Sequence, residues 1–331
     1  MNQSHNIERV AQTFGMFRRS FFCAMPCLIA IILCSCAGHR TLTAAEDDSA
    51  YPSYKYLPST VNWQRVQEGI DRFDFEDPVM PIRYHAVRID LETPDLELVA
   101  YPDRTTVEME NALEIDGSVK QPFVFTGMQT LSFARAYNCV VAMNATPFSG
   151  KPKQPAIFAQ LGTRRQILGI HKIKGITIAR PIERYAALIF ERDKTTGHLR
   201  ASVIDTQSEF LLSEIEAAFG GFYTVLKQGA EIPFSVRTHD SRSGAGVSDE
   251  GRFLYLLAVE GEDKSKSTGL SFPQCAAIFK KLGAETAMEF DGGSSTELCI
   301  KKQSVLSYKL TAVNANSFGF RVRAHAARSD Q

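Results

Sequence analysis

The stretch AMEFDGGSSTEL, residues 287–298, places a carboxylate, two glycines and three hydroxyl residues directly after an apolar run. If that run is a strand, the alternation of side chains makes Glu289 and Asp291 point the same way at its end. The loop that follows contains Gly292, Gly293, Ser294 and Ser295. Glycines with positive φ and successive N–H groups form an anion-binding nest, which is typical of a phosphate or sugar site. The same residues also fit a plain β-hairpin turn, and the pattern alone leaves both interpretations open.

Polar residues gather at three other places in the chain. The segment THDSRSGAGV contains His239, Asp240, Arg242 and Ser243. A His and an Arg this close can both face an oxyanion, although a solvated polar loop explains them as well. Glu260 ends the apolar run FLYLLAVEG in the way that Asp291 ends its own. Asn144 is the first polar residue after CVVAM, where it could bind a ligand or simply cap a turn.

These residues need elements that hold them in place. Alternating apolar and polar residues around a Thr-Pro-Asp turn predict a β-hairpin over residues 83–103. The pattern of residues 130–143 predicts a short helix that leads into a buried strand. Further strands are predicted at residues 175–179, 185–192, 199–205, 223–229, 253–261, 286–290 and 296–302. Helices are predicted at residues 208–220 and 271–283, the second with Pro273 in its first turn and Gly283 just past its end.

Strands outnumber helices, and several follow one another with no helix between them. This arrangement favours an α+β fold with a mixed central sheet and few helices over parallel βαβ winding. The chain of 331 residues, 44% of them apolar, is long enough to bury a substantial core. Its 37 basic and 37 acidic residues balance, so the composition gives no sign of a nucleic-acid partner.

The N-terminus has the layout of a secretory signal. Arg18 and Arg19 precede an apolar run from Phe21 to Cys34, which is short for a transmembrane helix of roughly 20 residues. The run ends in LCSC, which resembles a bacterial lipobox with Cys36 as the lipidated residue. Plain secretion and an uncleaved anchor are the alternatives.

The chain therefore divides into three parts. We expect a signal peptide of the lipoprotein type over residues 1–35, a polar tether over residues 36–59 and one domain over residues 60–325. Met16 could be the true start, because the residues before it add nothing that a signal needs. The protein is then expected to be exported to the cell envelope and anchored to a membrane by lipid on Cys36.

Three cysteines, Cys139, Cys275 and Cys299, lie in the predicted domain, and none has the CxxC spacing of a zinc site. Cys139 and Cys299 lie in apolar runs, so we expect them to be buried as small core residues. The sequence requires no cofactor. Its carboxylates are compatible with a bound Ca²⁺, but no ligand spacing demands one.

The clusters together resemble the phosphodiester glycosidase family, that of the uncovering enzyme N-acetylglucosamine-1-phosphodiester alpha-N-acetylglucosaminidase. Five motifs in the same order carry the resemblance: VAMNATPF, DSRSGAGVSDEG, LAVEG, STGLSFPQCAAIFKKLGAETAMEFDGGSST and VNANSFGF. It covers about residues 84–323. The chain departs from the family pattern at Ser294, where a third glycine is usual, and directly after Asn144, where glycines are usual. Glu289 and Glu260 stand where Asn and Asp are common.

The resemblance implies a phosphodiester-glycosidase-like domain and an exported hydrolase. Its substrate would be a sugar-1-phosphodiester in envelope or host glycans. Asp291 would act at the sugar carbon, with Glu289 or Glu260 activating water. Asn144 would bind a sugar hydroxyl. The residues implied at the phosphate and sugar are Gly292, Gly293, Ser294, Ser295, Arg242, Ser243 and His239. The alternative is a non-catalytic envelope lipoprotein that binds glycan or peptidoglycan in the same cleft.

We predict that Cys36 is the mature N-terminus and carries lipid, because the apolar run ends at LCSC with small residues around the cut. Mass spectrometry of the native protein should find a lipid-modified N-terminal peptide that begins at Cys36. An unmodified N-terminus, or one that begins at another residue, would contradict this prediction.

Overall fold

The computed structural model describes residues 56–77, 79–113, 123–150, 163–208, 215–235, 237–310 and 312–323. The predicted signal peptide and nearly all of the predicted tether lie outside these residues, so both stay predictions. Within the described part of the chain, no helix is long and apolar enough to cross a membrane.

The largest sheet has eight strands in the order β1-β2-β3-β17-β16-β18-β14-β15. Their bounds are β1 Gln64–Gln67, β2 Ile70–Glu76, β3 Arg83–Asp90, β17 Phe253–Val259, β16 Arg242–Ser248, β18 Thr286–Glu289, β14 Thr224–Lys227 and β15 Ala230–Glu231. A hairpin of β16 and β17 forms its centre, and the turn between them contains Asp249, Glu250 and Gly251, all with positive φ. The sequence analysis predicted no strand at β16.

Three smaller sheets complete the β structure, in the orders β20-β19-β6-β21-β4, β10-β9-β13-β11-β12 and β5-β8-β7. The first contains β20 Gln303–Ser304, β19 Leu298–Ile300, β6 Val141–Asn144, β21 Ser317–Val322 and β4 Leu96–Tyr101. The second contains β10 Ile176–Ala179, β9 His171–Ile173, β13 Ala217–Gly220, β11 Ala187–Arg192 and β12 Leu199–Ile204. The third contains β5 Val124–Thr126, β8 Arg164–Ile167 and β7 Phe148–Gly150.

Every strand pair within the described residues is antiparallel. The predicted mixed sheet is therefore wrong, and the fold is mostly β with helices at its outer faces. The reason is that parallel neighbours need a long crossover connection, usually a helix, and most consecutive strands here have none between them. Helices beside sheets still agree with the α+β class.

Two predicted elements have a different role in the structure. The strands of the predicted hairpin over residues 83–103 exist as β3 and β4, but β3 pairs with β2 and β17 while β4 pairs with β21. Alternation predicts a strand and its buried face, and it does not identify the partner strand. The predicted helix over residues 208–220 is wrong at Ala217–Gly220, which is the buried strand β13 between β9 and β11.

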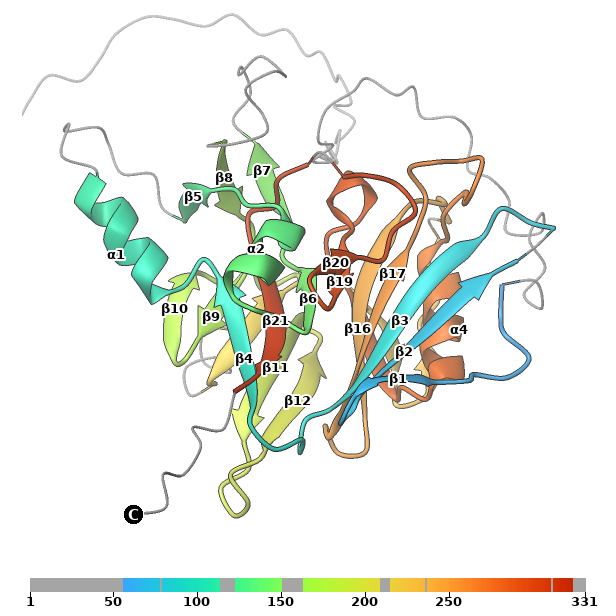
Figure 1. Ribbon diagram of the computed structural model, residues 1–331, viewed down its shortest axis with the longest axis horizontal. Coiled ribbons are helices and arrows are strands. Elements are labelled where there is room, and N and C mark those ends of the chain that lie inside the picture. Colours follow the sequence, from blue (N-terminus) through green and yellow to red (C-terminus); the bar gives the residue numbers. More distant parts are fainter. Residues whose placement is uncertain are drawn as a thin grey trace, which may run out of the picture. The chain divides into compact units, whose positions relative to one another are not determined.

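Helix α4 (Phe272–Leu282) covers the outer face of the eight-stranded sheet (Figure 1). Its predicted end signals are confirmed: Pro273 lies in the first turn and Gly283 follows the helix with φ of 106°. The helix lies close to β16 because Gly246 has no side chain. A Cβ at this glycine would lie 2.8 Å from the Cβ of Ala284 and 2.9 Å from a ring carbon of Phe279.

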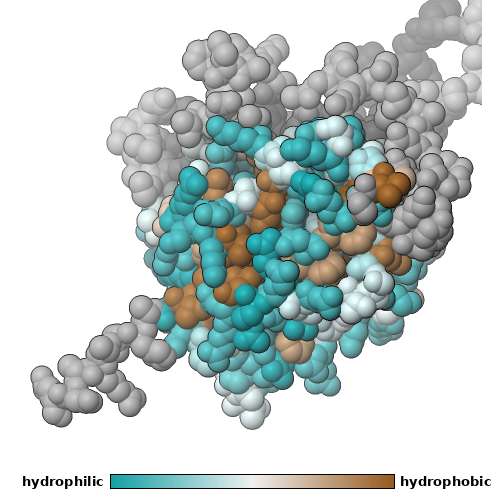
Figure 2. All heavy atoms as spheres, turned by 45° about the vertical axis from the view of Figure 1, so that its right-hand side comes forward, coloured by the Kyte–Doolittle hydropathy of each residue, from teal (hydrophilic) through white to brown (hydrophobic). Residues whose placement is uncertain are grey.

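The main core lies between the inner faces of the sheets and includes Val87, Met143, Leu256, Met288 and Phe318. Two shorter helices, α1 (Arg104–Leu113) and α2 (Thr130–Ala136), follow β4 and β5, and α2 packs on the outer face of β6 and β19. The predicted burial of Cys139 and Cys299 in this outer layer is confirmed, at 1% and 0% exposure. Hydrophilic residues cover most of the face in Figure 2, with smaller apolar patches between them.

We predict that Gly246→Ala destabilises the fold by about 1–3 kcal/mol, because the added methyl group forces Phe279 and α4 away from the sheet. Denaturant unfolding of both proteins checks this. Ser202→Val on the exposed side of β12 is the control and should change the free energy of unfolding by at most about 0.5 kcal/mol. Equal stability of Gly246→Ala and the unmodified protein would contradict the close approach of α4.

Candidate functional site

The eight-stranded and the neighbouring five-stranded sheet bring strand ends to the same place. In the ladder of β16 and β18, Gly244 lies opposite Glu289, so the start of β16 adjoins the end of β18. Asn144 ends β6 in the other sheet, and its Nδ2 donates a hydrogen bond to the backbone oxygen of Asp291, 147 positions away, at 2.7 Å. The Asp291, Asn144 and Arg242 segments therefore meet in the structure.

The loop that contains Asp291, Gly292 and Gly293, which we call the DGG loop, passes from one sheet to the other. It connects β18 in the eight-stranded sheet to β19 in the five-stranded one, so the hairpin interpretation of DGG is wrong. The loop is held from both sides, since the N–H of Phe290 donates to the carbonyl of Ser243 at 2.7 Å and that of Asp291 to the carbonyl of Ala145 at 2.9 Å. The loop is thus part of the junction between the sheets.

The two glycines of the loop serve different purposes. Gly292 has φ of −108°, which other residues also adopt, but a Cβ there would lie 2.7 Å from the carbonyl oxygen of Ser241. Gly293 has φ of 58°, in the left-handed region that favours glycine. Of the two glycines, only Gly293 thus has the positive φ expected of a nest, while Gly292 is required for space.

Most N–H groups of the loop are already used, which corrects the predicted anion nest. The N–H of Gly293 donates to Ser241 O at 2.9 Å, and that of Ser295 to Gly292 O at 3.2 Å. Residues Gly293–Ser295 form a single 3₁₀ turn, η4. Ser294 is partly exposed, and within the described residues neither its N–H nor its hydroxyl donates a hydrogen bond. Ser294 is therefore the residue of this loop that can offer donors to an anion.

Asp291 has a neighbouring carboxylate that the sequence did not single out as catalytic. Burial raises the pKa of Asp291 to about 7, with the charge of Asp240 acting in the same direction and the hydroxyl of Ser295 opposing it. Asp240 is partly exposed, and its Oδ2 would lie 3.8 Å from a Cβ on Gly293. Two carboxylates therefore face the same loop. In the sequence, only the position of Asp240 in the polar segment THDSRS, directly before Ser241, could have pointed to it.

Asn144 and Ser243 hold the site together from within. Asn144 is 1% exposed, and its Oδ1 accepts hydrogen bonds from the hydroxyl of Ser243 at 2.8 Å and the N–H of Glu297 at 3.0 Å. Ser243 is fully buried. The predicted roles of both residues in contacting substrate do not agree with this geometry, because their polar atoms are enclosed and bonded to the protein.

Glu289 is enclosed beneath the start of α4. Its side chain is 0% exposed, and neither of its oxygens has a hydrogen-bond partner by distance and angle within the described residues. Burial raises its pKa to about 7, while the charge of Arg242 and the weak donor thiol of Cys275 lower it. Because both oxygens of Glu289 are enclosed, its predicted water-activating role does not agree with the structure.

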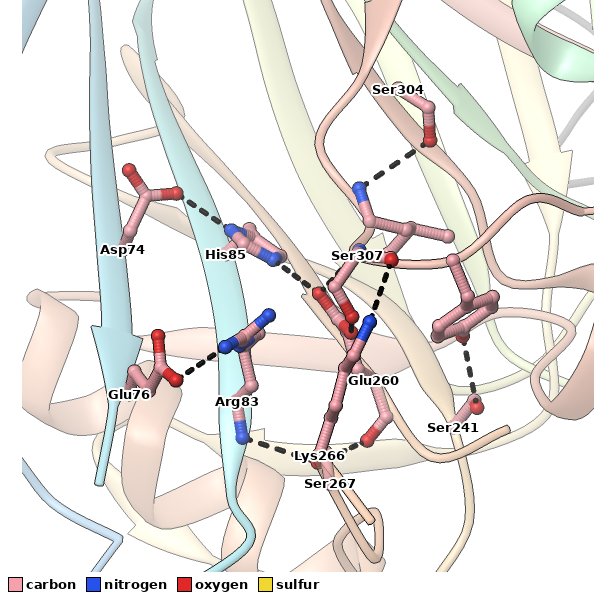
Figure 3. Close-up of polar contacts among 12 residues, drawn as sticks. Asp74, Glu76, Arg83, His85, Ser241, Glu260, Lys266, Ser267, Ser304 and Ser307 are labelled. Atoms are coloured by element: carbon pink, nitrogen blue, oxygen red, sulfur yellow. Dashed lines mark hydrogen bonds and ion pairs between the residues drawn. The ribbon is translucent and has the colours of Figure 1, made fainter. Parts of the chain in front are cut away.

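Glu260 belongs to a chain of polar groups, shown in Figure 3, that runs from exposed Asp74 through buried His85 to buried Glu260. Its Oε1 bonds to Nε2 of His85 at 2.8 Å, and Nδ1 of the same His85 bonds to Asp74 at 2.6 Å. Its Oε2 accepts a hydrogen bond from the hydroxyl of Ser307. Burial alone would lower the pKa of His85, but the carboxylates of Asp74 and Glu260 raise it. Burial alone would raise the pKa of Glu260, but the hydrogen bonds from His85 and Ser307 lower it. Because Glu260 is 1% exposed, its predicted catalytic role is replaced by a structural one.

The Arg242 side chain interacts mainly with other groups of the protein. Its Nε donates to Leu270 O at 2.9 Å and its Nη2 to Thr238 O at 2.6 Å. Its guanidinium carbon lies 4.4 Å from the centre of the Phe272 ring. The predicted phosphate contact can therefore use only the remaining N–H groups, two on Nη1 and one on Nη2. His239 is buried, which does not agree with its predicted place in an open oxyanion site.

Metal ligands do not gather at this place. Within the described ranges, no group of three or more His, Cys, Asp or Glu side chains could hold a metal ion. The described residues that meet at this place include two carboxylates, a glycine loop and Ser294.

The sequence profile of the phosphodiester glycosidase family matches residues 137–324, more than half of the chain. The chain therefore belongs to the phosphodiester glycosidase family. The match contains the segments that build the site, from Asn144 to the D-G-G loop. A search of curated proteins finds no match.

Solved structures share the fold. A hypothetical protein from Synechocystis is 16% identical with a TM-score of 0.55, and the match covers 80% of this chain and 64% of that one. The zebrafish N-acetylglucosamine-1-phosphodiester alpha-N-acetylglucosaminidase catalytic domain, auto-inhibited by its pro-peptide, is 14% identical with a TM-score of 0.52, covering 82% and 93%. A putative exported protein from Burkholderia pseudomallei is 13% identical with a TM-score of 0.50, covering 72% and 74%.

We predict that Glu289→Gln stabilises the protein at about pH 8 by a few kcal/mol relative to its effect at about pH 5. The folded-state pKa of about 7 exceeds the usual 4.5, so the folded state holds a proton that the unfolded state has released. This contribution to stability is lost as the pH rises through the folded-state pKa, and glutamine does not titrate. Denaturant unfolding at both pH values measures the difference.

The control for this test is Glu285→Gln, an exposed carboxylate just before the same strand. Its effect on the free energy of unfolding should be small and nearly independent of pH. An equal effect of Glu289→Gln at the two pH values would show that Glu289 is not protonated in the folded state.

Proposed function

We propose that this chain is an exported hydrolase that cleaves the glycosidic bond between a sugar and a phosphodiester group. The observation that carries the proposal is the meeting of Asp291 and Asp240 at the glycine loop, in a member of the phosphodiester glycosidase family. Glycosidases commonly use such a pair of carboxyl groups on either side of the reacting carbon.

The raised pKa of Asp291 suits it to hold a proton near neutral pH. As the glycosidic bond breaks, positive charge develops on the sugar and negative charge on the departing phosphodiester oxygen, and the attacking water gives up a proton. Asp291 donates a hydrogen bond toward the glycosidic oxygen, and Asp240 acts as the base. This replaces the assignment of the base to Glu289 or Glu260.

The phosphate lies against Ser294 in this proposal. Ser294 is partly exposed in η4, and a charged acceptor would strengthen hydrogen bonds from its N–H and hydroxyl. Arg242 adds positive charge nearby through its guanidinium. Export and a lipid anchor on Cys36 rest on the N-terminal sequence, which would place the substrate among envelope or host glycans.

A second candidate function is glycan or peptidoglycan binding without catalysis. The observation that favours it is the burial of Glu289 and Glu260, which leaves fewer reachable carboxylates than the sequence suggested. A binding protein would keep the glycine loop and Ser294 as contacts and would not depend on the proton of Asp291.

We predict that residues 37–331 hydrolyse at least one member of a panel of sugar-1-phosphodiesters that includes α-linked N-acetylglucosamine, glucose, mannose and galactose. Asp291→Asn should lower kcat by at least about 100-fold, because it removes the acid without changing the shape of the site. Asp240→Asn should lower kcat by a similar factor. Release of the free sugar is the measurement.

The matched control is Asp249→Asn, an exposed carboxylate in the turn at the other end of β16, which should keep the unmodified rate. Hydrolysis that persists in Asp291→Asn would exclude the proposed site. Tight binding of the panel without any hydrolysis would favour the second candidate function.

A further inference from the structure

The imidazole of His85 bonds to two carboxylates at the same time. This residue of β3 is 7% exposed. Its Nδ1 lies 2.6 Å from Oδ1 of Asp74 on β2, and its Nε2 lies 2.8 Å from Oε1 of Glu260, directly after β17. An ionised carboxylate only accepts hydrogen bonds, so both ring nitrogens must carry a proton to bond in this way. The geometry therefore fits the imidazolium form of His85.

Two arginines lie on the same two strands, but other groups engage them. Arg72 on β2 donates to Asp74 at 2.8 Å. Arg83, two positions before His85 on β3, donates to Glu76 of β2. The cation that bonds to the buried carboxylate at the end of β17 is thus the imidazolium (Figure 3).

Glu260 in turn holds the segment around Ser307. The N–H of Ser307 donates to Oε1 of Glu260 at 3.0 Å, and its hydroxyl donates to Oε2. Lys266 donates to the carbonyl of Ser307 at 3.1 Å. The hydroxyl of the next residue, Tyr308, lies 3.5 Å from Oγ of Ser241. Ser307 is partly exposed, so water can reach Glu260 from this side if the segment opens.

The backbone after Glu260 packs on the segment of Asp240. Gly261 follows Glu260 directly. A Cβ on this glycine would lie 2.5 Å from the nitrogen of Ser241 and 2.9 Å from the carbonyl carbon of Asp240. The N–H of Ser241 donates to Oδ1 of Asp240 at 2.8 Å, and its carbonyl accepts the N–H of Gly293 in the DGG loop at 2.9 Å. The position of Asp240 beside the DGG loop therefore depends on the position of Glu260.

We infer that His85 is a positioning residue of this site, which keeps Asp240 in place while the imidazole is protonated and loosens the Asp240 segment when the proton is lost. This rests on the proposed function, in which Asp240 is the base. A neutral imidazole has one N–H and can donate to only one of its two carboxylates. Glu260 is then a buried charge without a bonded cation, which is unfavourable unless water reaches it. Water enters on the side of Ser307, which weakens the contacts of this segment with Ser241.

The direction of the pH dependence follows from the contacts of His85. Burial alone would lower the pKa of His85, but the carboxylates of Asp74 and Glu260 raise it above the usual 6.5. Protonated His85 therefore stabilises the closed arrangement fully below pH 6.5, and this contribution is lost as the pH rises through the raised pKa. We expect the Asp240 segment to be held at acidic pH and loosened at alkaline pH.

Hydrogen exchange followed by mass spectrometry tests the inference with the full chain in detergent. The exchange of peptides that contain residues 239–243 and 305–309 is compared at about pH 6 and about pH 9, after correction for the intrinsic rate. The protection of both peptides should fall by about tenfold or more between these pH values, because loss of the buried cation favours local opening. A peptide from β11 is the internal reference and should keep its protection.

Three variants assign the effect to His85. His85→Gln has no charge to lose, so both peptides should be weakly protected at both pH values. Asp74→Asn keeps the buried ring and removes one carboxylate that raises its pKa, so the fall in protection should move to lower pH. Glu76→Gln removes an exposed carboxylate of the same strand that bonds to Arg83. It is the matched control and should behave as the unmodified protein.

The hydrolase activity should follow the same order. On a substrate from the panel above, kcat should fall at a lower pH in Asp74→Asn than in Glu76→Gln. The KM should stay nearly the same, because Asp240 acts on water in the proposed reaction. Titration of Asp291 is common to both variants, so it does not alter their comparison.

Three results would overturn the inference: the same protection profile in His85→Gln and the unmodified protein, a loss of protection confined to residues 305–309, or equal behaviour of Asp74→Asn and Glu76→Gln. Hydrolysis that depends on Asp291, with a pH profile that Asp74→Asn leaves unchanged, would keep the proposed function and remove the role of His85. Protection of residues 239–243 that follows the charge of His85 in a protein without hydrolase activity would keep this link and remove the proposed function.

Discussion

The buried side-chain amide of Asn144 joins three segments of the site. It accepts hydrogen bonds from Ser243 on β16 and from the N–H of Glu297 before β19, and it donates one to the backbone oxygen of Asp291. Asn144, Ser243 and Glu297 are buried, and an unpaired buried polar group costs about 1–3 kcal/mol. The amide therefore ties the eight-stranded sheet, the five-stranded sheet and the loop between them into one arrangement, and the direction of Asp291 depends on it.

Glycines allow the segments at this junction to pack closely against one another. Gly261, Gly269 and Gly292 come from three segments and all pack on the backbone of Asp240 and Ser241. A Cβ on any of them would lie 2.7 Å or less from a backbone atom there. With no side chains in between, the segment that carries Asp240 is held against the loop that carries Asp291. The carboxylates of Asp240 and Asp291 are thereby held at the same loop.

Burial then divides the acidic groups at this end of the fold into two kinds. Glu260 keeps its charge because His85 and Ser307 bond to it, and it fastens β17 to the segment after β20. Glu289, Asp291 and Glu297 have pKa values raised to about 7 by burial, so their neutral forms are favoured in the folded protein. Among these three, Asp291 is the one that reaches the surface, which makes its proton available to a ligand.

The sequence by itself determined about half of the strands, the helix α4 with both of its ends, the buried cysteines and the family. These depend on local features: side-chain period, turn residues and motif order. Only the tertiary structure decided that β3 and β4 lie in different sheets, that DGG crosses between sheets, and that Asp240 rather than Glu289 or Glu260 accompanies Asp291. Contacts between residues far apart in the chain decide which strands pair and which carboxylates are enclosed. A local sequence pattern does not reveal such contacts.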